Sequence, residues 1–220
     1  MRVALESDAD WREAIARGRR RGADLVCLPH VSFAPYVARA RDRAGLEFAE
    51  RAPSANMREA AVRADGAWVA ASAYESEGEG VFYLSAYFGG PGGIVRSGRQ
   101  RFVDGRAGRY EQMFWSPGHE PLQPAELPCG LTVGLVGADL RAPSAWAAAA
   151  RLRAECVVAG ASEPGDSWDL TLRLAAGMAA LHGMSALLVN RADDGFAGGS
   201  AAFAADGSEL QAGADGLYDL

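Results

Sequence analysis

Apolar and polar residues alternate with helical and extended periods along the N-terminal part of the chain. Residues 10–21 carry apolar side chains at helical spacing, and Gly22 is suited to end that helix. Residues 24–29 are apolar after Asp24 and end in a proline, which predicts a short strand buried on both faces. The pattern over residues 35–65 predicts two amphipathic helices, with Ser54 as the N-cap of the second.

The middle of the chain has the pattern of antiparallel strands. Residues 67–72 and 81–88 predict two strands, and the glutamate- and glycine-rich residues 75–80 between them predict a hairpin turn. The glycine-rich run 89–93 predicts a second turn that leads into a further strand. Since a strand rather than a helix follows it, this run is not the kind of loop that holds a phosphate. The polar residues 96–128 form the longest predicted loop region.

The C-terminal half alternates between apolar strands and helices. The predicted elements are strands at 131–136, 156–159 and 185–190, helices at 143–154 and 167–183, and a closing hairpin at 199–210. Mixed strands and helices in this order predict a layered α/β architecture. With no repeat and no linker to divide the chain, we expect a single domain over residues 1–220.

Composition excludes several classes of function. The chain has 220 residues, of which 49% are hydrophobic, and its formal net charge of −6 argues against a nucleic-acid-binding surface. The first residues lack the pattern of a signal peptide, and the most apolar stretch, residues 175–189, is too short to cross a bilayer. We therefore expect a cytoplasmic protein that binds neither nucleic acid nor membranes.

Reactive side chains are few and do not fall into metal-binding patterns. Cys27, Cys129 and Cys156 are far apart in the sequence, and each lies in or beside an apolar run, which predicts structural burial. The histidines have no metal-ligand spacing, so no metal and no cofactor is expected. All 22 basic residues are arginines, so no step of a reaction can use a lysine ammonium group.

Several short motifs appear in the order and spacing of one enzyme family. They are residues 22–29, 110–111 before 116–120, 131–143, and 190 before 196–200 and 206–207. Together they resemble the nitrilase superfamily of carbon–nitrogen hydrolases over nearly the whole chain. This resemblance implies a four-layer α-β-β-α sandwich that commonly dimerises.

The resemblance also implies where the family's catalytic residues should stand. The family uses a cysteine nucleophile, a glutamate base and a lysine that stabilises negative charge. In this chain His30 occupies the position of the glutamate, Gln100 aligns with the lysine, and Gly137 stands where the cysteine is expected, two residues before Asp139. Only a second glutamate of the family is matched, by Glu111. No residue is therefore assigned a catalytic role with the family's own chemistry.

The expected pocket consists of His30, Glu111, Gly137, Ala138 and Asp139, and three hypotheses follow for it. The first is a pseudoenzyme that binds a small acyl, amide or carboxylate ligand there or pairs with an active partner subunit. The second is a rewired carbon–nitrogen hydrolase in which His30 acts with Glu111.

In that second hypothesis, Gln100 or Arg99 supplies additional support for the reaction. The third hypothesis is a structural subunit whose only role is to associate through its surface, most simply as a homodimer. An open pocket beside Gly137 favours the first two hypotheses, whereas a pocket filled by side chains favours the third.

Overall fold

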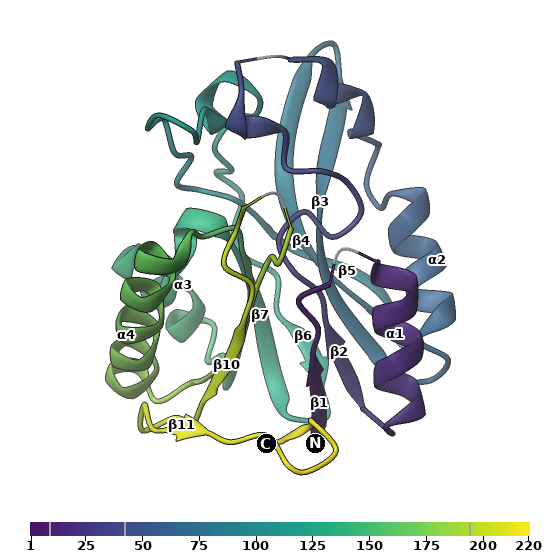
Figure 1. Ribbon diagram of the computed structural model, residues 1–220, viewed down its shortest axis with the longest axis vertical. Coiled ribbons are helices and arrows are strands. Elements are labelled where there is room, and N and C mark those ends of the chain that lie inside the picture. Colours follow the sequence, from purple (N-terminus) through teal and green to yellow (C-terminus); the bar gives the residue numbers. More distant parts are fainter. Residues whose placement is uncertain (9, 42, 194) are drawn as a thin grey trace.

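A computed structural model describes residues 1–8, 10–41, 43–193 and 195–220 of the chain. Two six-stranded sheets pack face to face, and a pair of helices covers the outer face of each sheet. Figure 1 shows α1 and α2 on one side of the molecule and α3 and α4 on the other. This is the four-layer α-β-β-α sandwich that the resemblance implied.

The first sheet, sheet A, holds the N-terminal strands and the extreme C-terminus. Its strand order is β12-β1-β2-β3-β4-β5, with β1, β2 and β3 parallel and the remaining neighbours antiparallel. The strands are β1 (Arg2–Leu5), β2 (Leu25–Cys27), β3 (Trp68–Gly78), β4 (Val81–Gly90), β5 (Gly93–Arg99) and β12 (Tyr218–Asp219).

The second sheet, sheet B, is built from the C-terminal half of the chain. Its order is β11-β10-β9-β8-β7-β6, with β7, β8 and β9 parallel. The strands are β6 (Ala125–Leu127), β7 (Gly130–Val136), β8 (Cys156–Ala161), β9 (Ser185–Asn190), β10 (Ser200–Phe203) and β11 (Glu209–Leu210). Helices connect the parallel strands, as crossover connections require.

The helices begin and end at residues that suit helix termini. They are α1 (Trp11–Arg20), α2 (Ala55–Arg63), α3 (Pro143–Arg151) and α4 (Gly165–His182). The side chain of Asp10 caps α1, Ser54 caps α2 as expected, and α3 starts at its proline. Gly183 ends α4 in the left-handed conformation that glycine adopts without strain.

Apolar side chains fill three layers between these elements. Ile15 and Met57 pack between sheet A and its helices, while Trp146 and Leu188 pack between sheet B and its helices. Phe88 belongs to the inner layer between the two sheets. Each of these side chains is almost completely buried, and full burial of such a group is worth about 1.5–3 kcal/mol.

The prediction of two amphipathic helices over residues 35–65 is half wrong. Only α2 forms; the preceding segment makes two short 3-10 turns, at Val37–Arg39 and Arg43–Phe48. Its backbone is bonded to distant residues instead: Val37 donates to the Tyr74 hydroxyl, and the Ala38 carbonyl accepts from Tyr110. These tertiary hydrogen bonds replace the local ones that a helix would make.

The predicted turn at residues 75–80 is shorter than expected, because β3 continues to Gly78 and only Glu79 and Gly80 turn the chain. Glu75 lies within the strand and is 2% exposed. Its carboxylate accepts hydrogen bonds from Ser85 and is paired with Arg99. The glutamate therefore suits a buried strand because it has partners there.

The long loop predicted over residues 96–128 contains regular structure at both ends. Residues 96–99 complete β5, and β6 occupies Ala125–Leu127. The pattern also gave no sign of β1 and β12, which are only four and two residues long. Such short pairings are fixed by the neighbouring strands rather than by their own sequence. In the described residues, no helix is long and apolar enough to cross a membrane.

Candidate functional site

Four of the residues singled out from the sequence meet where strands of the two sheets end. His30 follows β2, Gln100 follows β5, Gly137 follows β7, and Glu111 begins the 3-10 turn Glu111–Met113. A Cβ built on Gly137 lies 3.1 Å from His30 Nε2 and 3.2 Å from Gln100 Nε2. Gln100 Nε2 in turn donates to Glu111 Oε2 over 2.8 Å. The structure therefore brings together His30, Gln100, Glu111 and Gly137.

Glu111 and Gln100 form the polar centre of this group. Glu111 is 1% exposed, and its carboxylate accepts hydrogen bonds from the Tyr36 hydroxyl, the Asp104 amide and Gln100. The oxygen of the Gln100 amide accepts from Trp115 Nε1 over 2.9 Å. Burial raises the pKa of Glu111 above its ordinary value, although these donors oppose the shift.

His30 is enclosed beside this network. Its Nδ1 lies 2.8 Å from the Ser162 hydroxyl, and its ring packs against Tyr36. Within the described part of the chain, Nε2 has no hydrogen-bond partner. Burial, with a further contribution from Arg109 and Arg191, lowers the pKa of His30 to about 3. The imidazole is therefore neutral at physiological pH.

The backbone at Gly137 excludes most side chains. Its φ is +54°, a left-handed conformation that is costly for residues with a Cβ. The two nearest side-chain atoms, on His30 and Gln100, already stand closer than an ordinary contact to the position a Cβ would take. A larger residue at this position would require both the backbone and these neighbours to adjust.

Asp139 and Ala138 lie on the 3-10 turn that follows Gly137. Asp139 is 1% exposed, and its carboxylate accepts from the backbone amides of Arg101 and Phe102, which fixes the segment after β5. Burial raises the pKa of Asp139 to about 7 against these hydrogen bonds. Ala138 is partly exposed beside it. These hydrogen bonds to the Asp139 carboxylate thus come from backbone amides.

Several residues that support the group were not expected from the sequence. The guanidinium of Arg191 donates to the carbonyls of His30, Val31 and Ala34, and so holds the turn after β2. Arg109 donates to the Ser162 carbonyl and pairs with Glu163 over 2.8 Å. No motif in the sequence could have indicated these contacts, because they join residues more than 50 positions apart.

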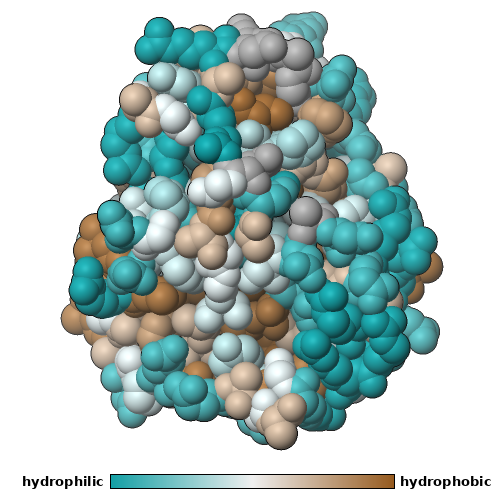
Figure 2. Space-filling view, in the orientation of Figure 1, coloured by the Kyte–Doolittle hydropathy of each residue, from teal (hydrophilic) through white to brown (hydrophobic). Residues whose placement is uncertain are grey.

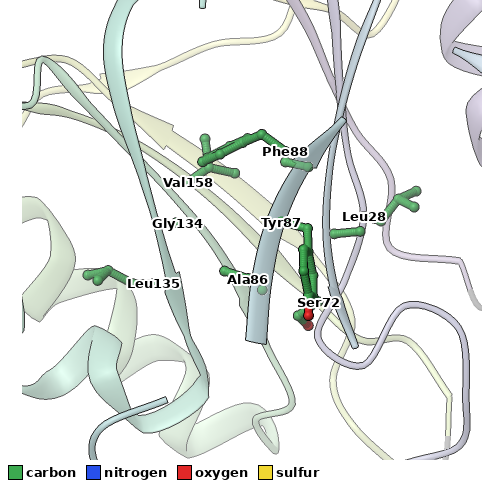
Figure 3. Close-up of a pocket in the computed structure, with 11 residues that line it drawn as sticks. Leu28, Ser72, Ala86, Tyr87, Phe88, Gly134, Leu135 and Val158 are labelled. Carbon is green, nitrogen blue, oxygen red and sulfur yellow. The ribbon is translucent and has the colours of Figure 1, made fainter. Parts of the chain in front are cut away.

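The centre of this group is closed to solvent. His30, Gln100 and Glu111 are 1%, 0% and 1% exposed. A separate hollow between the two sheets, lined by Phe88, Gly134 and Val158 among others, measures only about 10 Å³ (Figure 3). A space of that size holds about one water molecule at most. The burial of His30, Gln100 and Glu111 shows that the expected pocket is enclosed.

A larger hollow lies on the surface just outside the group. It measures about 400 Å³ and is lined by Arg39, Arg106, Arg109, Ser167 and Phe196, among others. Phe196 packs against Tyr36, so the hollow lies one aromatic layer away from Glu111. Among the described residues, no group of three or more histidines, cysteines or carboxylates is placed to hold a metal ion.

Comparison with known proteins identifies the family. The sequence profile of the carbon-nitrogen hydrolase family matches residues 9–216. This chain belongs to the carbon–nitrogen hydrolase family. A search of curated proteins found no match.

Solved structures of the family share the fold of this member. A carbon-nitrogen hydrolase from Helicobacter pylori G27 superposes with a TM-score of 0.82 at 17% identity, covering 99% of this chain and 87% of that one. An amidase from Nesterenkonia sp. AN1, with the acetamide moiety of fluoroacetamide added to its active-site cysteine, gives 0.80 at 22% identity, with 96% and 84% covered. At these identities the likeness concerns the fold.

We expect the free energy of unfolding to depend less on pH, at acidic pH, in the His30→Gln variant than in the parent protein. Because the pKa of His30 is about 3 in the folded chain and about 6.5 in the unfolded chain, only the unfolded chain binds this proton between those values. The stability that this pKa shift contributes is therefore fully present above pH 6.5. Below that pH, the free energy of unfolding falls by up to about 1.4 kcal/mol for each pH unit. Urea unfolding between pH 4 and 7.5 measures this slope.

Two comparisons isolate the effect of His30. Asp139, with its raised pKa, acts in the opposite direction, because the folded chain binds the extra proton between about pH 4 and 7. That contribution is common to both proteins and cancels in their difference. The exposed His119, replaced by glutamine, serves as the matched control and should leave the curve unchanged. Parallel curves for the parent and His30→Gln would contradict the assignment.

Proposed function

We propose that this member of the carbon–nitrogen hydrolase family is catalytically inactive and acts through its surfaces. The observation that carries this proposal is the packing around Gly137. The residue has no side chain, stands where the family's cysteine is expected, and is enclosed by His30 and Gln100. All three are buried, so a substrate would have no access to them.

The chemistry of the replaced residues supports the same conclusion. In a mutant of the Nesterenkonia amidase, an acetamide moiety is covalently added to the active-site cysteine, and Gly137 offers no side-chain atom for such a bond. Gln100 is neutral where the family has a lysine. Losing one preorganised group that stabilises negative charge costs roughly 100- to 1,000-fold in rate.

The rewired hydrolase is less well supported than the inactive protein. A histidine base needs a group that orients it, and His30 has its hydrogen bond to Ser162 rather than to Glu111. The carboxylate of Glu111 is already occupied by its own donors. A histidine with a pKa of about 3 is also a weak base at neutral pH. Arg99 offers no support, because it is paired with Glu75.

Purified protein is expected to hydrolyse neither nitriles nor simple amides at a measurable rate. Gly137→Cys alone should also remain inactive, because the new thiol would lack the carboxylate and the ammonium group that the family uses. The matched comparison is the triple variant His30→Glu, Gln100→Lys, Gly137→Cys, which regains the three residue types. Release of ammonia from a panel of amides and nitriles measures the activity.

Turnover by the unmodified protein would contradict this proposal if a single substitution in the centre abolishes that turnover. The two informative changes are His30→Ala and Glu111→Ala. Loss of turnover in both, with folding retained by circular dichroism, would establish the rewired enzyme. Turnover that survives both changes would indicate a contaminating enzyme.

We further propose that the chain self-associates through helices of one flank as a two-fold dimer. Leu170 and Leu181 on α4 are 46% and 73% exposed, which is unusual for large apolar side chains on one helix. Figure 2 shows hydrophobic surface at the left edge, where Figure 1 places α3 and α4, whereas the flank beside α1 is hydrophilic. Two-fold dimers are the commonest assembly of identical chains.

Light scattering at micromolar concentration is expected to give the mass of a dimer. Leu181→Glu should shift the mass toward that of a monomer, because it places a charge in the proposed interface. Val62→Glu is the matched control, since Val62 is 79% exposed but lies on α2. A monomeric parent protein would contradict the proposal, as would a dimer that only the Val62 variant disrupts.

A ligand, if this protein binds one, fits the outer hollow rather than the closed centre. Arg106 and Arg109 are paired with Asp104 and Glu163. Arg39 is exposed and lies over the ring of Phe196. Arginine recognises carboxylates through two parallel hydrogen bonds, so we propose a small carboxylate as the ligand of this hollow.

Isothermal titration calorimetry with succinate is expected to detect binding at low salt. Arg39→Gln should weaken it roughly tenfold or more, because one charge-assisted hydrogen bond is worth about 1.5–3 kcal/mol. Arg151→Gln, an exposed arginine at the end of α3, is the control and should bind as the parent does. Equal affinity of all three proteins would exclude the hollow as the binding site.

A further inference from the structure

The three cysteines of the chain meet in one place, although they are far apart in the sequence. Cys27 comes from β2 of sheet A, Cys156 starts β8 of sheet B, and Cys129 lies in the turn between β6 and β7. All belong to the apolar layer between the two sheets. Cys27 and Cys156 are buried, as expected, but the prediction of burial is wrong for Cys129, which is partly exposed.

Cys129 and Cys156 are neighbours through the register of sheet B. Thr132 on β7 is paired with Cys156 on the adjacent parallel strand β8, so their side chains share one face of the sheet. Cys129 Sγ lies 3.4 Å from the hydroxyl oxygen of Thr132. Thr132 Oγ1 in turn donates to the Gly130 carbonyl over 3.1 Å, and Cys156 Sγ donates to the Val157 carbonyl over 3.8 Å. Cys129 and Cys156 are therefore both neighbours of Thr132.

Cys129 also reaches the surface. It lines a hollow of about 550 Å³ together with residues of β9, β11 and the C-terminal strand, among them Ser185, Leu210 and Asp219. This hollow lies at the end of the sandwich where the chain termini meet (Figure 1). Cys129 precedes β7, whereas Gly137 follows it, so the thiol pair stands at the opposite end of that strand from the closed centre.

We propose that Cys129 is a modification site that reacts with hydroperoxides, and that Cys156 then closes a disulfide with it. Cys129 has access from a hollow and a polar contact with Thr132 at its sulfur, which are properties that such a thiol needs. Cys156, buried directly behind it, has the position of a resolving thiol. The proposal is independent of the inactive centre, because none of its residues takes part there.

The environment of Cys129 favours its thiolate. Interaction with Cys156, and then with Thr132, lowers the pKa of the Cys129 thiol to about 6, although partial burial opposes the shift. The carboxylates of Glu155 and Asp219 line the same hollow and would disfavour a negative charge there. The pKa of Cys156 is raised well above its ordinary value, so this residue stays a thiol and can donate.

The reaction proceeds in two balanced steps. In the first, the Cys129 thiolate attacks one oxygen of the hydroperoxide; the S–O bond forms, the O–O bond breaks, and an alkoxide or hydroxide leaves. The sulfur is oxidised by two electrons to a sulfenic acid, and the peroxide is reduced. In the second, the Cys156 sulfur attacks the sulfenyl sulfur and forms the S–S bond. The leaving hydroxide takes the Cys156 proton and departs as water.

Hydrogen peroxide and peptide mass spectrometry test the proposal on the full chain. The oxidised parent should lose two hydrogens and yield a cross-linked peptide pair containing Cys129 and Cys156. Cys156→Ser should instead keep a sulfenic acid on Cys129, which dimedone captures, and Cys129→Ser should show neither product. Cys27→Ser is the matched control, because Cys27 is buried in the same layer and should leave the cross-link intact.

Three results would overturn the proposal. The first is the absence of the cross-link after the parent protein has been oxidised, when circular dichroism shows that this protein is folded. The second is oxidation directed to Cys27. The third is equal dimedone labelling of the parent and the Cys156→Ser variant, which would mean that Cys156 resolves nothing. The Cys27→Ser variant also separates a specific effect from a loss of folding.

Discussion

The narrow space beside Gly137 is the constraint on which the centre of this protein depends. The ends of β2, β5 and β7 meet there, and the left-handed backbone of Gly137 lets His30 and Gln100 approach from both sides. A residue with a Cβ would meet both side chains at 3.1–3.2 Å. His30 and Gln100 can therefore pack this closely only because residue 137 is a glycine. Their packing encloses the centre between the two sheets.

A closed polar centre is stable only if its groups find partners, because burying an unpaired amide or carboxylate costs free energy. Here several separate segments of the chain supply these partners. Glu111 links Tyr36, Asp104 and Gln100, while Arg191 holds the carbonyls of the turn that carries His30. Within the described residues, His30 Nε2 and Arg101 Nε are the buried side-chain atoms that lack a partner. The His30 atom belongs to this centre. Its low pKa follows, since a proton there would be buried without an acceptor.

The pattern of the sequence predicted the layered fold, and the resemblance to a known family predicted four of the residues that meet in the centre. Neither predicted the hydrogen bonds that hold these residues together. Helical spacing and apolar runs predicted α1, α4 and the parallel strands other than β1, because each of these elements is stabilised by its own buried face. The helix expected before Ser54 does not form, because long-range hydrogen bonds to Tyr74 and Tyr110 replace local ones. The bond between His30 and Ser162 spans 132 positions, and no local pattern contains it.

The glutamine in the centre has a function that a lysine could not perform. Its amide nitrogen donates to Glu111, as an ammonium group would, but its oxygen also accepts from the indole of Trp115. A lysine has no acceptor, so it would leave the Trp115 N–H buried without a partner, at a cost of about 1–3 kcal/mol. It would also bring a full charge into a space with a neutral imidazole and no solvent. Gln100 thus joins Trp115 and Glu111 by its two hydrogen bonds, and Glu111 has a structural role as the acceptor of one of them.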